Sequence, residues 1–165
     1  MKFDHLFAAA ESKHSDRPHE TLEPLSNALG IKIQSQFDLS EPQDLADKVR
    51  RSYGGETVLI CWHHGAIPDL LKAFGAHPKE LLPRGKWPDD VFGWLIVLRY
   101  DQVGRLSAHV YNESLTPEDP KHPPPSQQGG SIRKIGIRSV LILNGADVCQ
   151  EELEIALQAV DVIRG

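Results

Sequence analysis

Thr57-Val-Leu-Ile-Cys-Trp-His-His-Gly65 is the stretch that decides the fold of this chain. Its apolar part, residues 58–62, is a continuous run of the kind that a parallel sheet buries on both faces. Two histidines and a glycine follow at once. Over residues 66–74 the apolar side chains then recur at helical spacing, with Pro68 in the first turn and Gly75 as a stop. The stretch therefore predicts a buried strand that leads directly into a helix.

The chain before this stretch shows the same alternation. Residues 4–10 form a short apolar run that predicts a buried strand feeding a polar loop. Pro18 suits a first helical position, and the apolar face that follows it ends at Gly30, which predicts a helix. Residues 31–33 then indicate a brief strand, and residues 41–52 indicate a surface helix.

The chain after the stretch adds a hairpin and one more strand and helix. Residues 94–100 and 106–111 predict two strands, joined by Asp101-Gln-Val-Gly104, which is typical of a hairpin turn. Residues 139–143 predict another strand, and residues 149–163 predict a helix. Strands that alternate with helices indicate an α/β fold. We expect a three-layer domain with a mainly parallel sheet and helices on both faces.

Length and breakers set the expected domain organisation. A chain of 165 residues suits one domain and buries a core without disulfides or a structural metal. Residues 117–130 contain too many prolines and glycines to pack as an element, so they predict a linker. We therefore expect an α/β domain over residues 1–116 and a C-terminal strand and helix unit over residues 131–165.

Charge and composition exclude several classes of protein. The chain has 18 Lys and Arg against 23 Asp and Glu, a net charge of −5, which argues against nucleic acid and membrane surfaces as partners. Its longest apolar runs are far shorter than the ~20 residues that span a bilayer. Cys61 and Cys149 are interpreted as buried thiols of a reducing compartment. These features predict a cytoplasmic protein.

A first polar cluster, Ser12-Lys-His-Ser-Asp-Arg17, follows the first predicted strand. Ligands of open α/β sheets bind at the carboxyl ends of strands. Arg17 precedes Pro18, which disfavours helical geometry at Arg17, so we expect its guanidinium beside the free N–H groups of a helix start, a good place for phosphate. The alternative is a solvated loop in which Arg17 forms a salt bridge.

The second cluster is His63-His64-Gly65, between the central strand and its helix. A histidine there can donate to a phosphoryl oxygen or act as acid or base, because its pKa lies near neutrality and the following helix favours an anion. A metal-binding pair and a structural role are the alternatives. The remaining histidines show no ligand spacing, and we expect no metal and no cofactor.

Two further groups have both a chemical and a plain interpretation. Trp62, Trp87 and Trp94 could form a stacking platform, but tryptophans in or beside apolar strands usually belong to the core. Asp89-Asp90 and Glu113 could supply a general acid, but acids in loops are usually solvated.

Several ordered motifs within residues 1–122 resemble the histidine phosphatase superfamily, also called phosphoglycerate-mutase-like. Asp4-His-Leu-Phe-Ala8, followed by Ser12 and Arg17-Pro-His-Glu-Thr21, is similar to a strand and helix of that family whose arginine contacts the phosphoryl group. Val58-Leu-Ile-Cys-Trp-His-His-Gly65 is similar to the strand before its second active-site histidine. The resemblance implies phosphate contacts from Arg17 and Ser12, and a catalytic role for His64, with His63 as the alternate.

The sequence departs from that family at the nucleophile. Family members open with a strand that ends in Arg-His-Gly, and its histidine becomes phosphorylated; this sequence contains no Arg-His-Gly. The resemblance therefore implies a protein that binds a small phosphorylated molecule and is impaired, or part of a longer enzyme, and it leaves open whether the chain is a phosphatase-like or phosphomutase-like hydrolase. The alternatives are a non-catalytic binding or regulatory protein and a metal-dependent hydrolase that uses His63 and His64.

A missing first strand would also leave a gap in the middle of a parallel sheet. Residues 139–165 have the required form, strand then helix, with Leu143-Asn-Gly145 in the place of Arg-His-Gly. This unit could fill the gap in its own sheet, could be an independent appended unit, or could pair with a second copy of the chain to give a homodimer.

Overall fold

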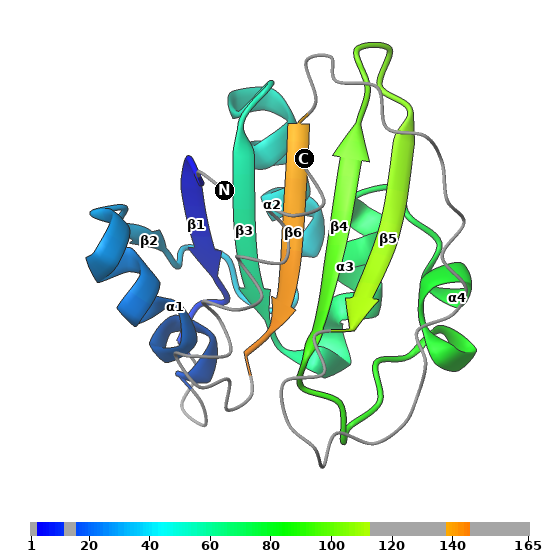
Figure 1. Ribbon diagram of the computed structural model, residues 1–165, viewed down its shortest axis with the longest axis horizontal. Coiled ribbons are helices and arrows are strands. Elements are labelled where there is room, and N and C mark those ends of the chain that lie inside the picture. The colour runs from blue at the N-terminus through cyan, green and yellow to red at the C-terminus, as the bar shows by residue number, and fades with distance from the viewer. Residues whose placement is uncertain (1–2, 12–15, 113–137, 146–165) are drawn as a thin grey trace.

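The computed structural model describes residues 3–11, 16–112 and 138–145, and these residues form an α/β fold around one sheet (Figure 1). The described part contains a sheet of six strands in the order β2-β1-β3-β6-β4-β5. Its strands are β1 (His5–Ala8), β2 (Ile33–Gln34), β3 (Thr57–Trp62), β4 (Trp94–Tyr100), β5 (Leu106–Asn112) and β6 (Arg138–Asn144).

The sheet is mainly parallel, as predicted. β1 pairs in parallel with β2 and with β3, and β3 pairs in parallel with β6. β4 is antiparallel to both of its neighbours, β6 and β5. The predicted hairpin of residues 94–111 is therefore the antiparallel end of the sheet.

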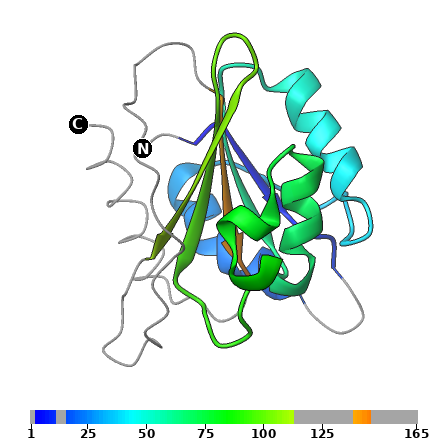
Figure 2. The same cartoon turned by 90° about the vertical axis from the view of Figure 1, so that its right-hand side faces the viewer.

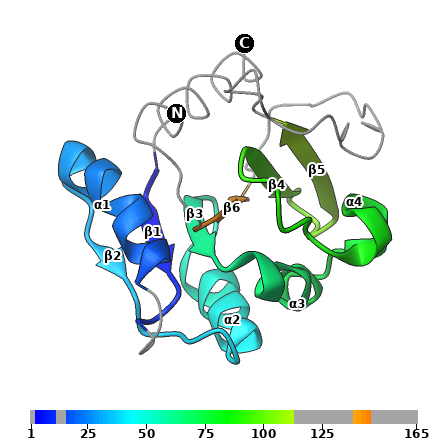
Figure 3. The ribbon, with the colours of Figure 1, turned by 90° about the horizontal axis from the view of Figure 1, so that it is seen from below.

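Helices pack on both faces of the sheet. α1 (Arg17–Leu29) contributes Leu22 and Leu25 to one face, whereas α2 (Pro42–Ser52) and α3 (Ile67–Ala73) cover the other. The edge-on view and the view from below show this division (Figures 2 and 3). Short helical turns complete the described part: η1 (His64–Ala66), α4 (Pro78–Leu81) and η2 (Pro83–Gly85).

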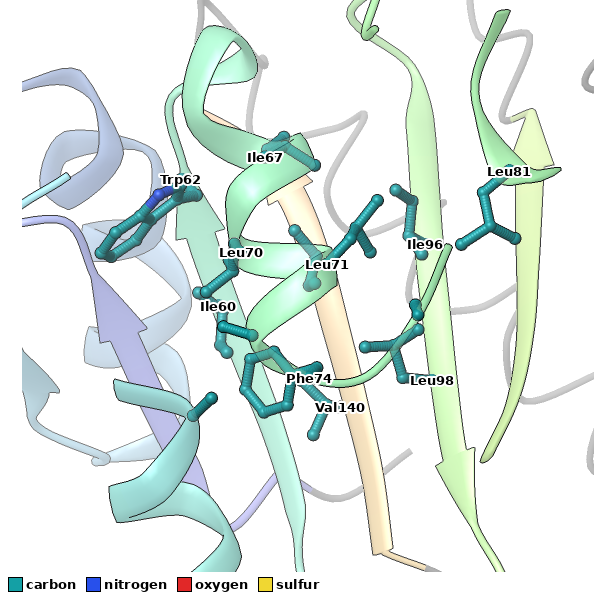
Figure 4. Packing of buried hydrophobic residues seen from close by; sticks show 14 of the residues in the cluster. Ile60, Trp62, Ile67, Leu70, Leu71, Phe74, Leu81, Ile96, Leu98 and Val140 are labelled. Carbon is teal, nitrogen blue, oxygen red and sulfur yellow. The ribbon is translucent and has the colours of Figure 1, made fainter. Parts of the chain in front are cut away.

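Alternate residues of β6 fill the core on the two faces. Val140 and Ile142 pack with α2 and α3, while Leu141 and Leu143 pack on the face of α1. Figure 4 shows Val140 beside the ring of Phe74, the residue that follows α3. A strand buried on both faces cannot sit at the edge of a sheet without exposing apolar surface, so this pattern places β6 in the interior.

β6 lies between β3 and β4 of the same sheet, in parallel register with β3 from Thr57↔Ser139 to Trp62↔Asn144. Three interpretations of the C-terminal segment were open. In the structure, residues 138–144 dock in the chain's own sheet. The division into a domain of residues 1–116 and a unit of residues 131–165 remains a prediction. The expected linker, residues 117–130, and the expected helix, residues 149–163, lie outside the described residues.

Two element boundaries differ from expectation. α1 begins at Arg17 rather than after it, because Pro18 can occupy an early helical position, where its missing N–H is not needed. The loop before β4 contains the turns α4 and η2, each of which starts at a proline. Among the described helices none is long and apolar enough to cross a membrane.

Candidate functional site

Three parallel strands, β1, β3 and β6, run to the same edge of the sheet, the lower edge in Figure 1. The polypeptide leaves β1 towards the start of α1, leaves β3 into His63 and His64, and leaves β6 at Gly145. This carboxyl edge is where open α/β sheets place their ligand sites.

The histidine pair forms the turn that joins β3 to α3. His63 is extended, with φ −74° and ψ 132°, and its Nδ1 accepts a hydrogen bond from the Gly65 N–H at 3.2 Å. η1 then begins at His64. The two imidazole rings stack, with centroids 4.3 Å apart. The sharp turn thus holds both histidines together at the edge.

Gly145 joins the ends of β6, β3 and α1. Its N–H donates to the carbonyl oxygen of Trp62 at 3.0 Å, which extends the β3–β6 ladder by one residue. A Cβ atom at Gly145 would lie 2.8 Å from the Cα of Pro18, closer than real Cβ contacts allow. Only glycine permits this approach, so the backbone of the first turn of α1 packs directly on the end of β6.

Arg17 makes one side of the edge electropositive, and the neighbouring His63 responds to its charge. The pKa of His63 is lowered from its ordinary value, first by burial, then by the neighbouring His64 and by the charge of Arg17, with Asp89 acting in the opposite sense. The influence of Arg17 on His63 supports the expectation that the two predicted clusters meet. A low pKa leaves His63 neutral near pH 7, so Arg17 supplies the fixed positive charge.

His64 faces an acid from the loop before β4. Its Nε2 lies 3.2 Å from Oδ1 of Asp89, and the His64 side chain is 24% exposed, whereas Asp89 is 94% exposed. Asp89, one of the candidate general acids, is therefore a neighbour of the predicted site, but an exposed ion pair of this kind holds its partners only weakly.

Six buried polar atoms of residues at this edge have no hydrogen-bond partner within the described part of the chain. They are Asp16 Oδ1, Ser35 Oγ at the end of β2, Trp62 Nε1, His64 Nδ1, and both Nδ2 and Oδ1 of Asn144. Such an atom costs about 1–3 kcal/mol when it is left unsatisfied, so native structures contain few of them. Their gathering at one edge marks the edge as a place built for further polar partners.

Sequence reasoning assigned Trp62 to the core and gave Asn144 no contact of its own. Trp62 is indeed fully buried, at the end of β3 on the face covered by α3 (Figure 4), but its indole N–H lacks a partner among the described residues. The available signal was position: Asn144 is a polar residue that ends an apolar run, and its pairing with Trp62 becomes visible only once β6 is placed beside β3.

The other candidate residues lie away from this site or among the residues that the structure does not describe. Ser12 and Glu113 belong to the residues that the structure does not describe, so the phosphate contact expected of Ser12 remains a prediction. Trp87 donates its indole N–H to the carbonyl oxygen of Val91 at 2.7 Å and is a satisfied core residue. Burial raises the pKa of the Cys61 thiol to about 12, which makes this free cysteine unreactive.

The described residues include no group of three or more His, Cys, Asp and Glu side chains arranged to hold a metal ion. No protein-family model matches the chain, and no curated protein or solved structure matches it. The residues of the carboxyl edge therefore provide the basis for a functional assignment.

Proposed function

We propose that this protein binds a phosphate or phosphoester group at the carboxyl edge of its sheet, with Arg17, His63 and His64 as ligand contacts. The observation that carries the proposal is the meeting of three strand ends: β1 leads to the start of α1, β3 to the histidine pair, and β6 to Gly145, which contacts the first turn of α1. A guanidinium beside a helix N-terminus and imidazole N–H groups is a suitable arrangement for an oxyanion.

The same geometry favours binding over efficient turnover. Phosphoryl transfer through a covalent intermediate requires a nucleophile in line with the leaving oxygen. The residue at the end of β6 is Asn144, whose amide is neither a nucleophile nor a base. This supports an impaired relative of the histidine phosphatases, or a non-catalytic binding or regulatory protein that uses the same site.

The cellular setting belongs to the proposal as well. Cys61 is a free, buried thiol among the described residues, as expected of a protein from a reducing compartment. We therefore place the protein in the cytoplasm, where its ligand would be a small phosphorylated metabolite rather than a nucleic acid.

Calorimetric titration of the full chain with phosphate and a small panel of phosphoesters tests the proposal, together with a phosphatase assay on the same panel. We expect measurable binding and little or no turnover. His64→Ala should weaken binding about tenfold, roughly the value of one hydrogen bond to a charged group. The matched control is His77→Ala, which removes an exposed histidine after α3, at the opposite edge of the sheet.

The outcomes separate the classes. Turnover that His64→Ala abolishes would make the protein an active phosphatase instead of an impaired one. Binding or turnover that His64→Ala leaves unchanged would show that the site lies elsewhere. Absence of binding to every member of the panel would remove the proposal.

A further inference from the structure

Asn144, Trp62 and His64 share one side of the carboxyl edge. Trp62 and Asn144 are register partners on neighbouring parallel strands, so their side chains emerge on the same face, that of α3. His64 follows two residues after Trp62 and starts the turn into α3. Arg17 belongs instead to α1, which packs on the other face. The edge therefore has a cationic side and an uncharged polar side.

The uncharged side offers both donors and acceptors. Trp62 Nε1 and Asn144 Nδ2 are donors, Asn144 Oδ1 is an acceptor, and His64 Nδ1 takes either role according to its tautomer. Each of these atoms is buried without a hydrogen-bond partner in the described ranges, and Asn144 as a whole is 1% exposed. The phosphoryl group of a dianionic phosphoester only accepts hydrogen bonds, so it would leave Asn144 Oδ1 unsatisfied. A hydroxyl group can donate and accept at once.

We infer that this uncharged side is a subsite for a hydroxyl group, so that the ligand is a phosphoester whose organic part carries at least one hydroxyl. The inference rests on the proposed function, because the phosphoryl group is held on the cationic side by Arg17 and His63. The hydroxyl donates to Asn144 Oδ1 and accepts from Asn144 Nδ2 or the Trp62 indole. No bond is formed or broken, and Asn144 is a binding residue for a reversibly held ligand.

As part of this inference, we take His64 to be the group that moves aside to admit the hydroxyl. Its polar atoms are closed off from solvent in this structure. His64 is the partly exposed member of the cluster, and the interaction given for its outer nitrogen is the ion pair with the exposed Asp89. Such a pair is easily broken.

Two ligands of equal carbon number test the subsite by calorimetry on the full chain: glycerol 3-phosphate, which carries hydroxyls, and propyl phosphate, which carries none. We expect the wild type to prefer glycerol 3-phosphate about tenfold. Asn144→Leu should abolish this preference while retaining affinity for propyl phosphate. It should also raise the melting temperature, because it removes a buried, unsatisfied amide.

Three further variants keep the test decisive. Trp62→Phe removes the indole N–H and should reduce the preference severalfold. Ile142→Val, a small change on the same strand and face, should leave the preference unchanged and serves as the control for packing. Arg17→Gln should weaken the binding of both phosphoesters equally, because Arg17 contacts the phosphoryl group that they share.

The proposal fails if the wild type binds the two phosphoesters equally, or if Asn144→Leu keeps the preference; in either case the orphaned amide holds an ordered water only, and the proposed phosphate site stands. A lower melting temperature for Asn144→Leu, together with an unchanged preference for glycerol 3-phosphate, would likewise assign Asn144 a structural role. Binding of neither phosphoester by the wild type overturns both this inference and the proposed function.

Discussion

At the scale of single residues, the site depends on the guanidinium of Arg17 and on the imidazole of His63 beside it. The lowered pKa of His63 keeps that ring neutral near pH 7, so the positive charge beside it comes from the guanidinium of Arg17. Because the folded chain resists protonation of His63 more than the unfolded chain does, this residue contributes stability above about pH 6.5 that is lost as pH falls through the range below it. Acid should therefore weaken the fold and a bound anion should oppose that effect.

Arg17→Gln should raise the pKa of His63, since it removes a positive charge that disfavours the imidazolium form. The measurement is a pH titration of the histidine ring resonances by NMR. Arg51→Gln is the control, because it removes the same charge from an exposed position on α2. An unchanged His63 titration in Arg17→Gln would mean that the two side chains do not share a site. Addition of phosphate to the wild type should shift the same titration upward.

At the scale of elements, the packing of β6 against α1 positions the arginine. The Pro18 backbone lies against Gly145, and Arg17 is the adjacent residue, so the strand end sets where the helix begins. The atoms nearest to an added Cβ include the Cα and N of Pro18, which cannot rotate out of the way. Gly145 therefore couples β6 to Arg17, the cationic contact of the site.

Gly145→Ala should destabilise the protein by about 1–3 kcal/mol, the usual cost of an added group in a packed contact, and should weaken phosphate binding by displacing Arg17. Urea unfolding and calorimetry measure the two effects. Pro18→Ala should not rescue the variant, because the clash involves backbone atoms. Gly65→Ala is the control for the urea unfolding alone, since its added Cβ would meet the His63 ring at an ordinary contact distance of 3.4 Å. Wild-type stability in Gly145→Ala would contradict the close approach.

Hydrophobic patterning predicted where the strands and helices lie in the sequence better than it predicted which strands lie side by side in the sheet. The runs at residues 58–62, 94–100 and 106–111 lie within β3, β4 and β5, because continuous or alternating apolar residues are a local property. The place of β6 between β3 and β4 is not local: it depends on which buried faces fit together across the sheet. Consequently the Arg17 and histidine clusters could be named from sequence, whereas the pairing of Asn144 with Trp62 could not.

At the scale of the whole molecule, the chain must cross the sheet to insert β6. Asn112, the last residue of β5, is level with Trp94 on β4, while Arg138, the first residue of β6, is level with Tyr100 at the other end of that strand. Six residues of strand rise and two strand spacings separate the two points by about 22 Å. Residues 113–137 are ample for that span, and the site exists only because they deliver β6 to the centre.

The length of this connection should therefore control assembly. A connection shortened to four residues reaches at most about 18 Å when fully extended, less than the separation it must cover, so β6 could dock only into a second copy of the chain. We expect light scattering to show an assembly twice the size of the wild-type protein, with phosphate binding retained because each site is rebuilt from two chains. A Gly/Ser connection of the native length should keep the wild-type size. A shortened chain that keeps both the wild-type size and its melting temperature would contradict the central position of β6 within its own sheet.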